Sequence, residues 1–253
     1  TAWYSTFRDA KQRVLKMKTE IVSKSNTPKT KRGEDRQKKL LNTAIKVFLE
    51  HGYEGASLEK IILDAGGSRS TIYSLYGSKK GLFLACLKSL VEEVYFAYAE
   101  HYDESRPWED ELIVFGKVFL TSILDDRAVN TSRLIFSQAA KDPDIGNWYY
   151  REGAELSYLC FAKVLENKLP LSLEELKPLA QHYIEMLKSD LYMKRLCGVS
   201  VSLNDQIVQD EVRLCADIFI NISKLGSDRL KLPRLQGPIV CKHKTSRRSI
   251  SIP

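Results

Sequence analysis

The stretch LLNTAIKVFLEHGYEGASLEKIILDAGGSRSTIYSLYGSKKGLF, residues 40–83, decides the fold of the chain. Its apolar residues recur at helical intervals until Gly52 ends the first predicted helix. Ser57 and Ser68 stand where helix N-caps are expected, and the pair Gly66-Gly67 makes the turn between the two following helices. Three short helices with tight breaks indicate a helix-turn-helix, in which the last helix lies in the DNA major groove.

The last of these predicted helices opens with side chains that suit DNA. Arg69 carries forked donors that match O6 and N7 of guanine, and Ser70 and Thr71 are short enough to lie close to base edges. A solvated surface arginine is the alternative interpretation of Arg69. The pattern therefore predicts base reading at the N-terminal end of this helix.

The composition is typical of a globular protein with one large domain or two modest ones. Of the 253 residues, 43% are hydrophobic, which is enough for a core. The chain has no apolar run of about 18 residues that would span a membrane, and its N-terminus lacks the apolar segment of a secretion signal. Five cysteines without a CxxC spacing argue against a zinc site or a disulfide framework and predict a reducing cytoplasm.

Charge is distributed unevenly along the chain. Residues 1–32 hold nine basic and two acidic residues, residues 226–253 hold seven and one, and residues 86–225 hold 15 and 23. A chain that touches phosphate with one end has this distribution, but solvated tails without a partner give the same numbers. Charge alone therefore leaves both interpretations open.

These patterns divide the chain into four predicted segments. Residues 1–33 form a basic N-terminal extension, whose amphipathic pattern over residues 5–22 would pack on the body or a partner, lie on an anionic membrane, or run along DNA. Residues 34–83 form the helix-turn-helix domain, and residues 84–225 form a larger helical domain. Residues 226–253 form a basic tail that we expect to be disordered.

Helical periodicity continues through the larger domain, and no strand-like alternation interrupts it. The predicted helices cover residues 78–105, 108–124, 131–140, 144–168, 172–196 and 204–224. An interruption is expected near Gly153. The predicted fold class is therefore all-α, with an N-terminal three-helix helix-turn-helix domain followed by a larger helical domain.

The sequence contains no motif of an enzyme, a cofactor site or a metal site. The four histidines fit no HExxH or Cys/His spacing, and the stretches GGSRS and GSKKG lack the G-K-[ST] ending of a phosphate-binding loop. Adjacent acids such as Asp125 and Asp126 point to different sides of a helix and form no catalytic pair. We therefore expect no enzymatic activity and no cofactor.

Residues 40–83 resemble the DNA-binding domain of the TetR/AcrR family of bacterial repressors. The resemblance is carried by Ala44–Phe48, Gly52-Tyr53, Ala65-Gly66, Thr71-Ile72-Tyr73, Tyr76, Ser78, Lys79 and Leu82. The stretches AGGSR, YGSKKGLF and FSQAAKDPDIGNWYYREG are similar to the branch that contains AefR-like and NalC-like regulators. The resemblance extends from about Gly33 to Lys224.

The resemblance implies that the partner is a double-stranded DNA operator. Tyr73 and Lys79 match positions that bind phosphates in the family, and Ser57 is a third such position. Core packing is the alternative interpretation of Tyr73. The predicted DNA-binding residues are Ser57, Ser68, Arg69, Ser70, Thr71, Tyr73 and Lys79.

The resemblance also implies a ligand cavity among the helices that follow the helix-turn-helix domain. Aromatic residues are dense between residues 95 and 161, although ordinary core packing explains most of such a pattern. We expect a small hydrophobic or aromatic effector. The residues predicted to bind it are Tyr98, Tyr102, Phe115, Phe119, Phe136, Gln138, Trp148 and Tyr158.

The last two predicted helices carry wide apolar faces. These faces consist of Leu179, Tyr183, Met186, Leu187 and Leu191 on one helix and Ile207, Val212, Cys215, Phe219 and Ile222 on the other. A monomer can bury one face of each helix by itself. The family resemblance and the two-fold symmetry of operators favour a homodimer formed through these two helices.

The residues and the resemblance together predict a homodimeric, ligand-responsive transcriptional repressor of the cytoplasm that an effector releases from its operator. Sequence does not fix the sign of regulation, so activation is an alternative. A rival of another class is a membrane-surface or partner-binding helical protein that acts through its basic amphipathic N-terminus. A helical-bundle enzyme is a second rival, but it needs cofactor or metal ligands that the sequence does not offer.

Overall fold

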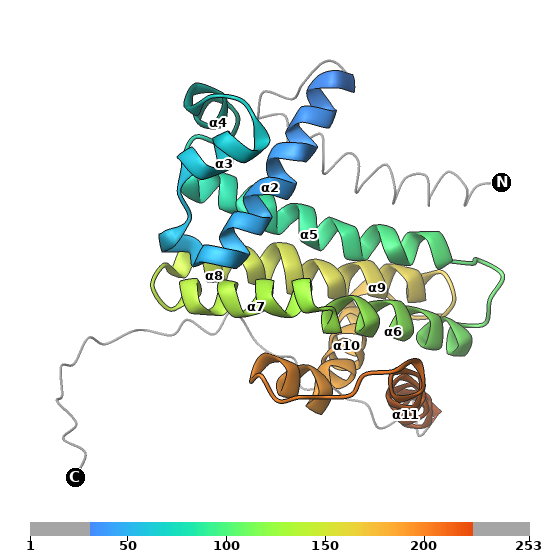
Figure 1. Ribbon diagram of the computed structural model, residues 1–253. Helices are drawn as coiled ribbons and strands as arrows, with labels where there is room; N and C mark the ends of the chain where they lie inside the picture. The colour runs from blue at the N-terminus through green and yellow to red at the C-terminus, as the bar shows by residue number, and fades with distance from the viewer. Residues whose placement is uncertain (1–30, 225–253) are drawn as a thin grey trace, which may run out of the picture.

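The computed structural model describes residues 31–224, and every regular element in this range is helical. The head comprises α2 (Lys31–Gly55), α3 (Leu58–Ala65) and α4 (Arg69–Tyr76). The long helix α5 (Lys79–His101) begins in the head and continues into the body (Figure 1). The predicted all-α fold, with an N-terminal helix-turn-helix domain and a larger helical domain, is confirmed.

The body continues with α6 (Trp108–Leu124), α7 (Asp126–Ala139), α8 (Pro143–Tyr149), the π-helix η1 (Tyr150–Glu155), α9 (Leu156–Glu166), α10 (Leu173–Leu196) and α11 (Asp205–Lys224). In Figure 1, α10 and α11 lie on the side of the body away from the head. The predictions of an amphipathic helix over residues 5–22 and of a disordered tail over residues 226–253 lie outside the described residues. Within residues 31–224, no helix is long and apolar enough to cross a membrane.

Serine caps and glycine breaks define the helices of the head. Gly66 and Gly77, at φ 79° and 73°, end α3 and α4 in a conformation that a Cβ atom disfavours. The hydroxyl oxygens of Ser57, Ser68 and Ser78 accept hydrogen bonds from backbone amides of the first turns of α3, α4 and α5, at 3.1, 3.2 and 3.0 Å. The predicted caps of all three helices are therefore present.

Several helix boundaries differ from the predicted ones. Helix α5 ends at His101 because the carboxylate of Asp103 accepts hydrogen bonds from the amide and hydroxyl of Ser105, at 2.9 and 2.7 Å, and turns the chain. Helix α7 begins at Asp126 instead of residue 131 because Asp125 caps it. The interruption near Gly153 is the π-helix, so the chain stays helical there.

The head packs on the body through a shared hydrophobic core. Phe48 of α2, Ile61 of α3 and Phe83 at the start of α5 are each at most 1% exposed. Ile135 of α7 and Ile145 of α8 belong to the same buried cluster. The head is therefore seated on α7 and α8.

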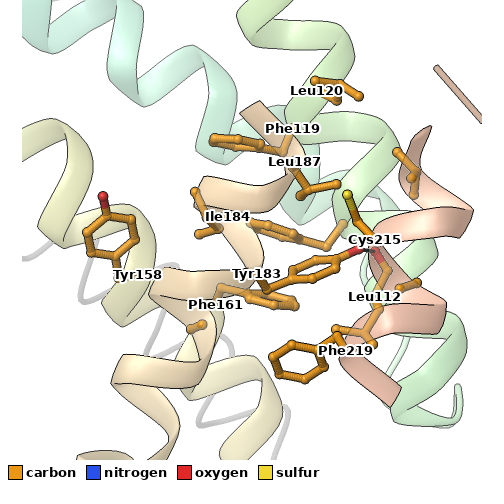
Figure 2. Close-up of a cluster of buried hydrophobic side chains, with 14 of the residues drawn as sticks. Leu112, Phe119, Leu120, Tyr158, Phe161, Tyr183, Ile184, Leu187, Cys215 and Phe219 are labelled. Carbon is orange, nitrogen blue, oxygen red and sulfur yellow. Dashed lines mark hydrogen bonds between the residues drawn. The ribbon is translucent and has the colours of Figure 1, made fainter. Parts of the chain in front are cut away.

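A second core joins α6, α9, α10 and α11 (Figure 2). At its centre, the Tyr183 hydroxyl donates a 2.7 Å hydrogen bond to the carbonyl of Leu112. The rings of Phe161 and Phe219 each lie 5.4 Å from the Tyr183 ring, centroid to centroid. A Cβ atom on Gly116 would lie 2.7 Å from the Tyr183 hydroxyl, so this glycine lets α10 approach α6 closely.

One buried carboxylate, that of Glu111, lies where the connection between α5 and α6 packs on the body. Glu111 is fully buried and accepts a 2.7 Å hydrogen bond from the Tyr98 hydroxyl. Arg106 lies 3.2 Å and Lys168 3.7 Å from the same carboxylate. Because its charge is paired from two sides, Glu111 fixes the 102–107 connection against the start of α6 and the end of α9.

Candidate nucleic-acid interface and ligand cavity

The N-terminal end of α4 presents a group of exposed hydroxyls. The Ser68 hydroxyl lies 2.7 Å from the Ser70 hydroxyl and 2.9 Å from the Thr71 hydroxyl. All three residues are exposed. Ile72, at 1% exposure, anchors the opposite side of α4 in the core of the head and so fixes which residues face outward.

Arg69 and Tyr73 lie one turn apart on the exposed side of α4. The Arg69 side chain is 64% exposed and forms an ion pair with Glu59 of α3, and Tyr73 is 52% exposed. Exposure of a large aromatic side chain beside an exposed arginine leaves both available to a nucleic acid. The core-packing alternative for Tyr73 does not fit its exposure.

The other two predicted phosphate-binding residues stand at helix N-termini. Ser57 caps α3, and Lys79 is the first residue of α5. The Lys79 ammonium donates a 3.1 Å hydrogen bond to the Glu54 carbonyl and lies 5.0 Å from the centroid of the Tyr53 ring. Helix N-termini carry free amide donors and a partial positive charge, which favours phosphate.

A cavity of about 300 Å³, half-open to solvent, lies between the helices of the body. Its wall is formed by α5, α6, α7, α9, α10 and the π-helix, together with Tyr149 at the end of α8. The apolar residues of this wall include Leu87, Leu90, Val94, Phe119, Ile123, Ile135, Ala154 and Ile184. Polar groups are fewer. They include the pair Glu93 and Arg127, 3.0 Å apart, and the Tyr192 hydroxyl, which donates a 2.9 Å hydrogen bond to Ser132.

Only two of the eight residues predicted to bind an effector, Phe119 and Tyr158, line this cavity. Phe115 instead stacks on Phe161 in the body core, with 3.9 Å between ring centroids. Tyr98 is hydrogen-bonded to Glu111, and the ring of Tyr102 lies against Lys168, whose ammonium is 5.3 Å from the ring centroid. Phe115 therefore belongs to the body core, and Tyr98 and Tyr102 belong to the group of side chains around Glu111 and Lys168.

The remaining three predicted residues also lie away from the cavity. Phe136 is 47% exposed because it follows Ile135, and neighbouring residues point about 100° apart around a helix. Gln138 is buried near the end of α7, and Trp148 packs against the core of the head. Aromatic density along the sequence did not reveal which side of each helix faces the cavity.

Several residues that line the cavity were not predicted from the sequence. Ile184, Lys188 and Tyr192 recur every four residues on α10. This spacing is visible in the sequence and marks one face of a helix. Tyr149 also lines the cavity; it ends α8 and lies directly before the π-helix, a place that the density of aromatic residues in the sequence does not single out.

An ion cluster joins the start of α5 to the start of α8. The Lys80 ammonium lies 2.7 Å from a carboxylate oxygen of Asp142 and 2.9 Å from one of Asp144. Asp142 is the N-cap residue of α8, and Tyr149 at the other end of α8 lines the cavity. Helix α8 therefore connects the cavity wall with the first turn of α5.

The apolar faces predicted for dimerisation are largely used within the subunit. Tyr183 and Leu187 of α10, and Val212, Cys215 and Phe219 of α11, are buried in the body core. Helix α11 has a second apolar stripe, which is exposed. Leu214, Ile218 and Ile222 are 56%, 40% and 47% exposed and recur every four residues.

Comparison with known proteins identifies both parts of the chain. Residues 40–86 match the family described as bacterial regulatory proteins, tetR family. Residues 110–222 match the C-terminal domain of AefR-like transcriptional repressors. The chain belongs to the TetR family. The family consists of DNA-binding transcriptional regulators and not of enzymes, as the sequence led us to expect.

Relatives of this TetR-family chain are transcriptional regulators. YezE of Bacillus subtilis (strain 168), an HTH-type transcriptional regulator, is 27% identical over 132 residues, which cover 51% of this chain and 68% of YezE. The HTH-type transcriptional repressor ComR of Escherichia coli (strain K12) is 36% identical over 52 residues, which cover 21% of this chain and 25% of ComR.

Solved TetR-family structures share the fold. A TetR-family regulator from Mesorhizobium loti MAFF303099 superposes with a TM-score of 0.63 at 20% identity, covering 76% of this chain and 98% of the other. The flavonoid-responsive regulator FrrA superposes with a TM-score of 0.61 at 19% identity, covering 75% and 97%. Proteins of this family bind DNA operators and small-molecule effectors and form dimers.

Proposed function

We propose that this TetR-family chain is a homodimeric repressor that leaves its operator when a small hydrophobic or aromatic molecule fills the cavity. One observation carries the proposal: the cavity wall and the head share structural elements. Ile135 lines the cavity and also belongs to the buried core of the head. Helix α5 carries Lys80 at its head end and cavity-lining residues such as Leu90 farther along.

The geometry of α4 supports DNA recognition by the head. Arg69 reads a base in the major groove, and Ser70 and Thr71 lie close to base edges beside it. Ser57, Ser68, Tyr73 and Lys79 hold phosphates, since each stands at a helix N-terminus or on the exposed side of α4.

The exposed stripe of α11 supports a dimer through the last two helices. Leu214, Ile218 and Ile222 offer one apolar face to a second subunit, and a two-fold axis along this face pairs it with itself. Such a dimer places two copies of α4 on one duplex. Successive turns of the major groove require a spacing of about 34–36 Å between them.

The elements shared by the cavity wall and the head support release by an effector. A ligand shifts the head only by its difference in affinity between two arrangements of the body, and about 1–3 kcal/mol is typical of such coupling. The apolar wall of the cavity fits a hydrophobic or aromatic molecule. The structural neighbour FrrA is named as responsive to flavonoids, which are aromatic molecules.

Fluorescence polarisation tests the proposal. Purified protein is titrated against a labelled duplex from the promoter region of its own gene and against a scrambled duplex, at two salt concentrations. We expect selective binding that weakens as salt rises and saturates at one or a few dimers per site. Equal binding of both duplexes contradicts the proposal, because it shows attraction to charge without recognition of sequence.

A further inference from the structure

We propose that the effector is an uncharged molecule whose one polar oxygen group hydrogen bonds with the hydroxyls of Tyr149, Ser132 and Tyr192. These three residues, here the hydroxyl cluster, all line the cavity. The inference rests on the proposed function of the cavity and adds the chemical class of its ligand. It specifies a largely apolar body, one alcohol, phenol or carbonyl oxygen, and no net charge.

The hydroxyl cluster brings together three separate parts of the body. The Tyr192 hydroxyl, from α10, donates a 2.9 Å hydrogen bond to the Ser132 hydroxyl of α7. The Tyr149 hydroxyl, from the end of α8, lies within reach of both of them. Each hydroxyl can both donate and accept, so the cluster can turn a proton or a lone pair toward a ligand without leaving a buried group unsatisfied.

Other hydroxyls of the cavity wall are engaged with protein acceptors. Ser122 and Thr131 each donate a 2.7 Å hydrogen bond to a carbonyl of their own helix. The Tyr158 hydroxyl donates to a carboxylate oxygen of Glu185 at 2.5 Å. A ligand oxygen therefore competes with a backbone carbonyl or a carboxylate at these positions, whereas at the hydroxyl cluster it joins an exchangeable network.

The charges of the cavity wall argue for a neutral ligand. The guanidinium of Arg127 is paired with Glu93 at 3.0 Å, and the ammonium of Lys188 is paired with Glu185 at 2.6 Å. Arg127 and Lys188 are the cations among the residues that line the cavity, and both are thus neutralised by a carboxylate. An anionic ligand would lose part of its hydration without gaining a free cation, which is costly in a largely apolar site.

Tyr149 also gives the hydroxyl cluster a connection to the head. Burial raises the pKa of its hydroxyl further above the usual value of about 10, so the group is protonated and uncharged at neutral pH. The side chain of Tyr149 packs against the buried core of the head, and its backbone ends α8. A ligand that hydrogen bonds with this hydroxyl therefore acts on the element that carries Asp142 and its ion pair with Lys80.

Equilibrium dialysis of the full chain with three naphthalene probes tests the inference. The probes are 2-naphthol, which has one hydroxyl, 2-methylnaphthalene, which has none, and 2-naphthoate, which is an anion. They are measured with the wild type, with Ser132→Ala and Tyr192→Phe, and with Ser122→Ala as the matched control in the cavity wall. Circular dichroism and gel filtration establish that each variant is folded.

We expect 2-naphthol to bind the wild type, and 2-naphthoate to bind at least about ten-fold more weakly. Ser132→Ala and Tyr192→Phe should each weaken the binding of 2-naphthol about three- to ten-fold, which is the contribution of one hydrogen bond. Neither variant should change the affinity for 2-methylnaphthalene. Ser122→Ala should leave the affinity for 2-naphthol and the affinity for 2-methylnaphthalene unchanged.

Three results would overturn the inference. They are binding of 2-naphthoate as tight as that of 2-naphthol, equal effects of the cluster variants on 2-naphthol and 2-methylnaphthalene, and no binding of any probe to the wild type. Operator binding, measured separately by polarisation, tests the proposed function. Cluster-dependent binding of 2-naphthol by a protein that ignores its operator would uphold the ligand class and reject the repressor.

Discussion

The ammonium of Lys80 lies 2.7 Å from the carboxylate of Asp142, and this pair joins the first turn of α5 to the N-cap of α8. Lys80 lies at the head end of α5, and Asp142 begins the helix that ends at the cavity wall. The proposed mechanism must connect these two parts of the chain. The pair lies near the surface, where water weakens each ion pair. Its importance is therefore positional, since it fixes how α8 sits against α5.

Lys80→Met tests this pair through the pH dependence of stability. Hydrogen bonding from Lys80 lowers the pKa of Asp142, so the folded state loses this contribution as pH falls through the lowered pKa, below the unfolded value of about 3.9. Urea denaturation should show the wild type more stable than Lys80→Met at pH 7, with the difference shrinking in acid. Lys46→Met, at an exposed position of α2, is the control, and a difference that persists in acid contradicts the assignment.

Arg69→Ala and Lys79→Ala should affect DNA binding in different ways. Loss of Arg69 should cost about 1–3 kcal/mol at one base position and relax discrimination there. Loss of Lys79 should weaken binding to all duplexes and make affinity less dependent on salt. Polarisation titrations with the operator and with single-base variants measure both effects. Equal losses on specific and random DNA for the two variants would falsify these roles.

Gly116→Ala should destabilise the body by about 1–3 kcal/mol, because the new methyl group overpacks the core. Its Cβ atom would lie 2.7 Å from the Tyr183 hydroxyl and 2.8 Å from a methyl carbon of Val212. Gly55→Ala is the matched control, since the nearest atom to its Cβ is at 3.6 Å. Urea midpoints compare the two variants, and equal midpoints would show that α6 and α10 can separate at little cost.

Ile218→Asp should convert the dimer to a monomer, because it places a carboxylate in the middle of the exposed apolar stripe of α11. Light scattering coupled to gel filtration measures the mass over a range of concentrations. Arg213→Asp, also exposed on α11 but outside the stripe, should stay dimeric. A dimer that survives Ile218→Asp places the subunit contact elsewhere.

The helix breaks of the head could be read from the sequence because each depends on a local signal. Gly66 supplies a positive φ, and Ser57, Ser68 and Ser78 supply capping oxygens within three residues. The residues predicted to touch DNA follow from these caps, since α4 begins where Ser68 ends the turn. Local chemistry thus predicts both the elements and the side chains at their ends.

The residues that line the cavity could not be predicted in the same way, because the cavity wall depends on the rotation of each helix about its axis. Phe119 faces the cavity, but Phe115, one turn earlier, stacks on Phe161. On α11, apolar residues occupy two faces, and the sequence does not state that Phe219 is buried within the subunit while Ile218 is exposed. Contacts far apart along the chain decide both cases.

The π-helix over Tyr150–Glu155 has a consequence for how the pocket can change over time. A π-helical turn holds about one residue more than an α-helical turn, so removing one residue from this segment would restore α-helical winding and leave α9 in nearly the same rotation relative to α8. Tyr158 would then stay in the cavity wall, whereas the same deletion within an ordinary α-helix would turn all later residues by about 100°. A single-codon deletion at the π-helix could thus pass through evolution without exchanging the chemistry of the pocket.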